Sequence, residues 1–167
     1  MAPIHVKDLS GEARAIPDPH GKATVLIFIT TDCPISNSYV PEINRIYAQY
    51  SPRDVAFYIV YADPTVSRDE MRRHSRDYRL QPDTLADESH LLAKRVGATI
   101  TPEAVILAPD GERLYRGRID NVYAALGKRR DQPTERDLRD ALDAFLSGKP
   151  VAKPATEAIG CFITFDP

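Results

Sequence analysis

Apolar residues along this chain follow two patterns, continuous runs and helical stripes. Residues 24–30 and 55–61 are apolar almost without interruption, which is typical of strands buried on both faces of a sheet. Elsewhere apolar positions recur every three or four residues, as on one face of an amphipathic helix. The alternation of the two patterns along the chain predicts an α/β fold with both runs near the centre of the sheet.

Local signals mark the ends of the other elements. Ser67 and Glu70 have the spacing of a capping box, and Pro41 interrupts a helical stripe. Pro109-Asp110-Gly111 separates two short apolar runs and predicts a hairpin. The predicted helices are 37–50 with a kink at Pro41, 67–78, a short one capped by Asp87 that ends before Gly97, and one capped by Thr134 and closed by Gly148; the predicted hairpins pair 5–9 with 14–16 and 104–107 with 112–116.

Length and composition are those of a globular protein with one domain. The chain has 167 residues, 43% hydrophobic and 28% charged. No apolar run approaches the ~18 residues of a membrane-spanning helix, so we expect no membrane insertion. The net charge of −2 argues against a nucleic-acid partner. We expect residues 1–148 to form the domain, and residues 149–167, with three prolines, to form an extended tail that carries Cys161 and packs on the same domain.

Cys33 is the candidate reactive residue. It lies four residues after Ile29, the last apolar residue of the first run, and precedes Pro34 and a helical stretch. A sulfur at the N-terminal end of a helix meets unpaired N–H groups and the positive end of the helix dipole, which favour the thiolate. We therefore expect Cys33 to reach solvent as a redox-active thiol. Asp32 should oppose this effect, because an adjacent carboxylate raises the pKa of a thiol.

The segment from Phe28 to Ser36 resembles the active-site strand, turn and helix of thioredoxin, with Cys33 at the first position of the CxxC pair and Ser36 at the second. The phrase Asp32-Cys33-Pro34-Ile35-Ser36-Asn37 and the tail Gly160-Cys161-Phe162-Ile163 resemble a bacterial redoxin subgroup that is peroxiredoxin-like (AhpC/TSA-like). The resemblance covers residues 5 to 147. It implies a thioredoxin-like fold, in which helices flank a central mixed sheet, with an N-terminal hairpin and a mid-chain helical insertion.

The same resemblance implies roles for residues around Cys33. Thr101-Pro102 aligns with the proline that thioredoxin-fold proteins hold in the cis form beside the cysteine, where the backbone of Thr101 would pair with an extended substrate. With Pro34 and Ser36, these residues form the expected substrate-binding set. Ser36 cannot resolve a mixed disulfide, so another thiol must do so. Cys161 is the internal candidate for a second catalytic cysteine, or it is a spare cysteine.

The predicted function is thiol-disulfide exchange through Cys33, with protein or small-molecule thiols and disulfides as partners and no cofactor or resident metal. A peroxide reductase is one alternative, because Thr30, Cys33 and Pro34 have the peroxiredoxin ThrxxCysPro spacing. Against it, Ser36 stands where such enzymes place their reactive cysteine.

A second alternative is a non-catalytic module that binds a protein partner, or copper through Cys33, Cys161 and a histidine such as His20. We expect His74 and His90 to lie on the surface of helices, and Arg118 and Asp120 to pair with each other. The chain as given opens without a signal-peptide pattern, which favours the cytoplasm, or an extracytoplasmic location if a signal peptide has been removed.

Overall fold

A five-stranded mixed sheet forms the centre of the molecule in the computed structural model, which describes residues 2–165. The strand order is β5-β4-β3-β7-β8, with β3 parallel to β4 and antiparallel to β7. The fully apolar run of β3 is buried at every position, as a strand with neighbours on both sides requires. The strands are β3 Ala23–Ile29, β4 Val55–Tyr61, β5 Asp83–Ala86, β7 Glu103–Leu107 and β8 Arg113–Gly117.

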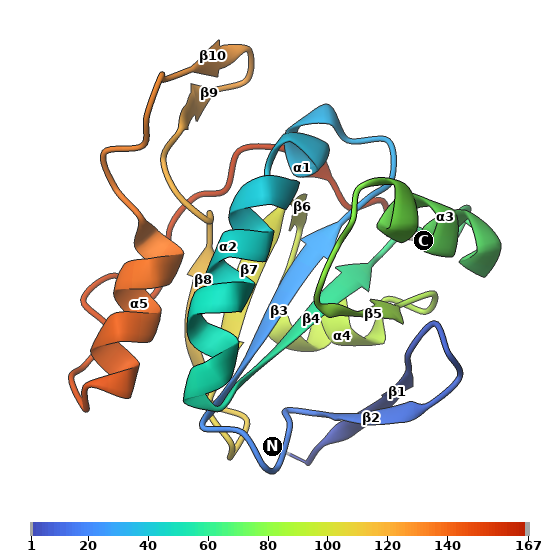
Figure 1. Cartoon of the computed structure of the whole chain (residues 1–167), viewed down its shortest axis with the longest axis horizontal. Coiled ribbons are helices and arrows are strands. Elements are labelled where there is room, and N and C mark those ends of the chain that lie inside the picture. Colours follow the sequence, from blue (N-terminus) through green and yellow to red (C-terminus); the bar gives the residue numbers. More distant parts are fainter. Residues whose placement is uncertain (1, 166–167) are drawn as a thin grey trace.

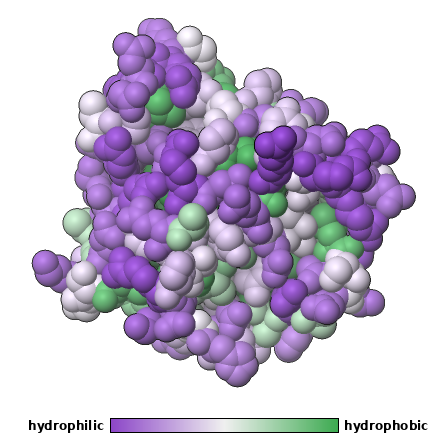
Figure 2. All heavy atoms as spheres, in the orientation of Figure 1, coloured by the Kyte–Doolittle hydropathy of each residue, from purple (hydrophilic) through white to green (hydrophobic). Residues whose placement is uncertain are grey.

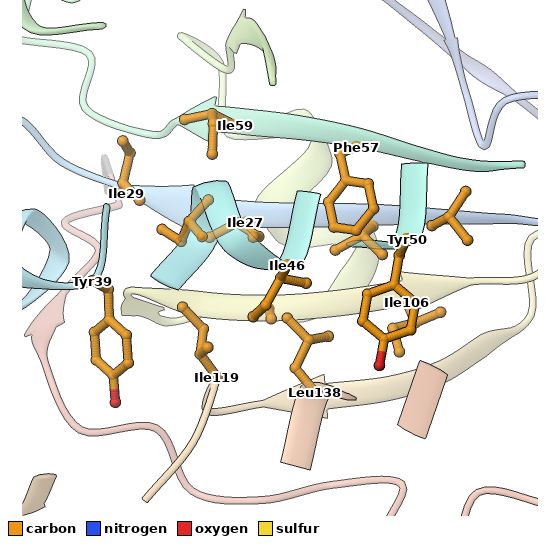
Figure 3. Packing of buried hydrophobic residues seen from close by; sticks show 14 of the residues in the cluster. Ile27, Ile29, Tyr39, Ile46, Tyr50, Phe57, Ile59, Ile106, Ile119 and Leu138 are labelled. Carbon is orange, nitrogen blue, oxygen red and sulfur yellow. The ribbon is translucent and has the colours of Figure 1, made fainter. Parts of the chain in front are cut away.

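Helices cover both faces of this sheet (Figure 1), which confirms the predicted fold class. On one face, Ile46 and Tyr50 of α2 and Leu138 of α5 pack against Ile27, Ile106 and other strand residues (Figure 3). A second core on the opposite face joins strand residues to α4 and to the N-terminal hairpin. The helices are α1 Pro34–Ser38, α2 Val40–Tyr50, α3 Arg68–Asp77, α4 Leu91–Val96 and α5 Asp137–Leu146, with a 3₁₀ turn η1 at Ser51–Arg53.

Capping signals located most of the helix ends. The capping box of Ser67 and Glu70 is present at the start of α3, and both carboxylate oxygens of Asp87 accept N–H groups of α4. The predicted kink at Pro41 is a complete break at Tyr39, which separates α1 from α2. Because proline has no N–H to donate, it suits the first turn of α2 better than the interior of one long helix.

The predicted cap at Thr134 is wrong. α5 begins three residues later, at Asp137. The side chain of Asn121, distant in sequence, accepts the N–H groups of Thr134 and Glu135 at 2.8 and 2.9 Å. These bonds hold that segment as a loop, so its backbone donors are satisfied without a helix.

The predicted hairpins are confirmed, and several short strands are additional. β1 (Ile4–Lys7) pairs antiparallel with β2 (Ala13–Ile16), and β7 pairs antiparallel with β8. The sequence pattern does not predict β5, a four-residue strand with two buried positions. It also does not predict the hairpin of β9 (Tyr123–Ala125) and β10 (Lys128–Arg129), or the pair formed by β6 (Ile100–Thr101) and β11 (Cys161–Phe162).

The chain after α5 runs back across the edge of the sheet to the C-terminal end of β3. The tail first lies beside β8, where the N–H of Arg116 donates to Pro154 and that of Thr156 donates to Arg116. The hydroxyl of Thr156 also bonds to the hydroxyl of Tyr115 at 2.6 Å. The tail then reaches β6, so residues 149–165 lie against the body of the protein at two places (Figure 1). Positions 166 and 167 of the predicted tail lie outside the described residues.

The surface in the view of Figure 2 is largely hydrophilic, with apolar atoms in small separate patches. None of the helices within residues 2–165 has the length and apolar character needed to span a bilayer.

Candidate functional site: a cysteine pair between the first helix and the tail

Cys33 lies where the central strand β3 gives way to α1. It is the residue that caps the N-terminus of α1, in an extended conformation, and its sulfur accepts the N–H of Ser36 at 3.5 Å. Pro34 occupies the first turn, where its missing N–H costs nothing. The local sequence therefore places the sulfur against the N–H groups of a helix start, as predicted.

The expectation that Cys33 reaches solvent is wrong. The residue is only 1% exposed. Its S–H donates to the carbonyl of Thr101 at 3.5 Å, and Cys161 lies opposite Thr101 in the pairing of β6 with β11. The tail thus covers the position that a bare helix start would leave open.

Thr101 is the residue on which the tail docks. The Thr101–Pro102 peptide is cis. Thr101 pairs antiparallel with Cys161, its hydroxyl donates to the carbonyl of Cys161 at 3.3 Å, and Ile163 donates its N–H to Thr99 at 2.8 Å. The strand of the tail therefore occupies the place beside Thr101 at which the sequence predicts an extended substrate.

Gly160 permits this close approach of the two backbones. A Cβ atom on Gly160 would lie 2.0 Å from the carbonyl oxygen of Thr101 and 2.8 Å from its carbonyl carbon. Both are backbone atoms, which cannot rotate away as a flexible side chain would. A side chain at position 160 is incompatible with the observed pairing of β6 and β11.

The two thiols differ in acidity. Burial raises the pKa of Cys33, but hydrogen bonds from the thiol of Cys161 and from the backbone and side chain of Ser36 outweigh it, so the pKa lies below its ordinary value. Burial raises the pKa of Cys161 to about 11, and its bond to Cys33 and the charges of Cys33 and Asp32 act in the same direction. Cys33 is therefore the more acidic thiol of the pair. The charge of Asp32 contributes to the raised pKa of Cys161.

The hydroxyl group of Ser36 is close enough to Cys33 to affect its pKa. The side chain is fully buried, and its Oγ has no hydrogen-bond partner of ordinary geometry within residues 2–165. The hydroxyl nonetheless contributes to the lowered pKa of Cys33. A buried hydroxyl without a partner is costly, and a negative charge on the neighbouring sulfur would satisfy it.

The sequence analysis did not identify a network of side-chain hydrogen bonds that begins at Asn37 of α1. Asn37 donates to the carbonyl of Thr31 at 3.1 Å and accepts from Nε2 of His74 at 2.7 Å; Nδ1 of His74 then accepts from the hydroxyl of Tyr61 at 2.8 Å. Burial lowers the pKa of His74, which agrees with this neutral tautomer. This network connects the loop before Cys33 to α3 and β4. The only member of the network near Cys33 in the sequence is Asn37, four residues after the cysteine.

The expected surface positions of the two histidines are wrong. His74 is 8% exposed and His90 is 1% exposed. His90 lies at the start of α4 and its Nε2 bonds to the carbonyl of Ala62 at 2.9 Å. Both rings are buried because each one satisfies a polar group of another element.

Two further expectations concern charged and metal-binding groups. Arg118 pairs with Glu135 and Asp137, whereas Asp120 accepts from the hydroxyl of Tyr39, so the predicted Arg118–Asp120 pair is wrong.

No group of three or more His, Cys, Asp or Glu side chains within residues 2–165 is placed to hold a metal. The copper arrangement considered from the sequence, with His20 beside the cysteines, is therefore not formed by the described residues.

The lowering of the Cys33 pKa by Cys161 predicts a shift in reactivity with pH. Cys161→Ala removes the thiol of Cys161, so the pKa of Cys33 should rise relative to Cys161→Ser, whose hydroxyl can still donate. The pH dependence of iodoacetamide alkylation at Cys33 measures this difference. Identical profiles for the two variants would show that a donor at position 161 does not stabilise the thiolate of Cys33.

Solved structures similar to this one share its fold. An uncharacterised conserved protein from Geobacillus kaustophilus has a TM-score of 0.84 at 28% identity, over 99% of this chain and 89% of that chain. A hypothetical protein from Sinorhizobium meliloti has a TM-score of 0.81 at 24% identity, over 99% and 92%. A secreted Mycobacterium tuberculosis disulfide oxidoreductase, homologous to E. coli DsbE, has a TM-score of 0.60 at 21% identity, over 87% and 95%.

Sequence comparison identifies the family. No curated protein matches this chain. Residues 1–113, more than half of the chain, match the AhpC/TSA family. These residues include the hairpin β1–β2, Cys33, α1 and the Thr101–Pro102 bond. The chain therefore belongs to the AhpC/TSA family, and its fold is thioredoxin-like.

Proposed function

We propose that this protein is a thiol-disulfide oxidoreductase in which Cys33 and Cys161 of one chain form the redox pair. The observation that carries the proposal is the register of β6 and β11. It sets Cys161 opposite Thr101, the residue whose carbonyl accepts the S–H of Cys33 at 3.5 Å. Two thiols held beside the same residue, one of them with a lowered pKa, suit disulfide exchange.

The reaction consists of two exchange steps. In the oxidising direction for the protein, one of its thiolates attacks an external disulfide, forms a mixed disulfide and releases the first external thiol. The other cysteine of the pair then attacks the protein sulfur of the mixed disulfide and releases the second external thiol. The protein loses two electrons and two protons, which leave on the external thiols, and a Cys33–Cys161 bond remains.

The residues around the pair have supporting roles in this proposal. Pro34 and Ser36 shape the helix start, and the N–H and hydroxyl of Ser36 stabilise the thiolate. Thr101 and Pro102 form the edge to which the tail pairs. We infer that residues 1–148 form the domain and that residues 149–167 are a tail that supplies the second cysteine.

The mass of the protein under non-reducing conditions tests the pairing. After oxidation by diamide, the wild-type chain should lose two hydrogens, and a peptide that joins Cys33 to Cys161 should appear after digestion. Cys33→Ser and Cys161→Ser should each keep their full mass as monomers. A wild-type protein that keeps two free thiols would refute the pair. Consumption of hydrogen peroxide with formation of a sulfenic acid at Cys33 would instead favour the peroxide reductase.

A further inference from the structure

The two sulfurs of the proposed pair differ in their access to solvent. Cys33 is 1% exposed, whereas Cys161 is partly exposed and lines a cavity of about 340 Å³. Cys33 is not among the residues that line this cavity. An external molecule in the cavity would therefore meet the sulfur of Cys161 first.

The walls of this cavity carry negative charge and hydroxyl groups. Its two ionisable side chains other than Cys161 are the carboxylates of Asp32 and Asp63, with no cationic side chain among the lining residues. Asp63 is held in place by the N–H and hydroxyl of Thr65, at 2.8 and 2.6 Å. The complete lining is Thr30, Asp32, Ala62, Asp63, Pro64, Thr65, Cys161, Phe162 and Thr164.

The tail of this protein occupies the position beside Thr101 at which an extended peptide would pair. β11 pairs with β6 on the side of Thr101 where a substrate strand would lie, so a peptide could pair there only after the tail had left. The cavity beside Cys161 needs no such movement, and its volume suits a small molecule.

We propose that the external thiol is a small molecule without net negative charge, and that it reacts at Sγ of Cys161 from this cavity. The proposal rests on the proposed function, because it requires a Cys33–Cys161 disulfide. It names the sulfur at which exchange with the outside takes place and the class of molecule that exchanges.

The proposed reaction is a thiol-disulfide exchange in two steps. The external thiolate forms a bond to Sγ of Cys161, the bond between the two protein sulfurs breaks, and the electron pair goes to Cys33, which leaves as a thiolate that accepts the N–H of Ser36. A second external thiolate attacks the external sulfur of the mixed disulfide and releases Cys161, which takes up a proton. One protein disulfide and two thiols become one protein dithiol and one small disulfide. A leaving thiol of low pKa leaves faster, which favours Cys33 in that role.

The charge of the cavity sets the expected order of substrates. Two carboxylates that line the same cavity as the reacting sulfur attract an ammonium group and repel a carboxylate, even with the screening of water. Per thiolate present, cysteamine should therefore reduce the oxidised protein about tenfold faster than 3-mercaptopropionate, with 2-mercaptoethanol between them.

Single-turnover reduction of the diamide-oxidised protein by these three thiols tests the proposal. The reaction is quenched with N-ethylmaleimide, and digestion then shows which cysteine carries the thiol adduct. The adduct should lie on Cys161 and maleimide on Cys33. The double variant Asp32→Asn, Asp63→Asn should bring the rates of cysteamine and 3-mercaptopropionate within about twofold of each other. Glu112→Gln, in the exposed turn between β7 and β8, is the matched control and should keep the wild-type order.

The outcomes separate this proposal from the proposed function. If diamide does not join Cys33 to Cys161, the proposed function fails first. If the disulfide forms but the adduct lies on Cys33, or the order of the thiols is the same in the double variant, the assignment of the cavity is wrong while the redox pair stands.

Discussion

Replacement of Cys33 by serine is expected to lower the turnover of a small disulfide such as cystamine by at least about a hundredfold, to the uncatalysed rate. Serine keeps nearly the same size and can still accept the N–H of Ser36, so the fold should persist. The hydroxyl has no nucleophilic form near neutral pH, and it cannot form a disulfide. Turnover with a reducing thiol in excess, followed by release of free thiol, measures the loss.

Cys161→Ser serves as the comparison for this experiment. It preserves Cys33 and a hydrogen-bond donor beside it, but no internal sulfur is left to resolve the mixed disulfide. Turnover should again fall by an order of magnitude or more, because the sulfur that lines the cavity is gone and Cys33 stays buried under the tail. Full turnover in Cys161→Ser would show that Cys33 works without Cys161, and full turnover in either variant would refute the proposed redox pair.

Gly160→Val should release the tail from the site. The added Cβ would lie 2.0 Å from the carbonyl oxygen of Thr101, so β11 must move away from β6. Cys33, buried at 1% exposure in the wild-type protein, would then be open to reagents in solution. Alkylation of Cys33 by N-ethylmaleimide should become about tenfold faster or more, and formation of the Cys33–Cys161 disulfide should slow by a similar factor.

Gly127→Ala is the control for a general loss of stability. Gly127 lies between β9 and β10 with a φ of +74° and nothing within 4 Å of an added Cβ. Alanine there should cost about 1 kcal/mol through its backbone conformation, without contact with the cysteines. Cys33 alkylation should then stay at the wild-type rate, and circular dichroism should confirm that both variants are folded. Equal alkylation rates for Gly160→Val and the wild type would show that the tail does not protect Cys33.

The main features of the fold could be predicted because they depend on local patterns. The apolar runs of β3 and β4 admit few interpretations other than buried strands, and the capping box of Ser67 and Glu70 locates the start of α3 from four residues. Elements with weak local signals were missed. β5 has four residues, and β6 and β11 have two each, too short for a hydrophobic period to show.

The predictions about individual side chains failed where a distant partner decides the environment. Thr134 has the composition of a helix cap, but Asn121 takes up its N–H group and that of Glu135. His74 falls on a polar helix, yet Asn37 and Tyr61 bind both of its ring nitrogens. In each case the partner lies more than ten residues away, and no pattern near the residue itself reports it.

The amino-acid sequence by itself determined that Cys33 would meet the N–H groups of a helix start after a buried strand, since that placement depends only on neighbouring residues. Only the tertiary structure decided that Cys33 is buried, and that Cys161 is the residue beside it. The register of β11 against β6 depends on Gly160, which lets the two backbones meet, and on the hydrogen bonds that anchor the tail to Arg116. Arg116 lies in β8, far from both cysteines in the sequence. Such contacts come from packing of the whole molecule, which local sequence patterns do not encode.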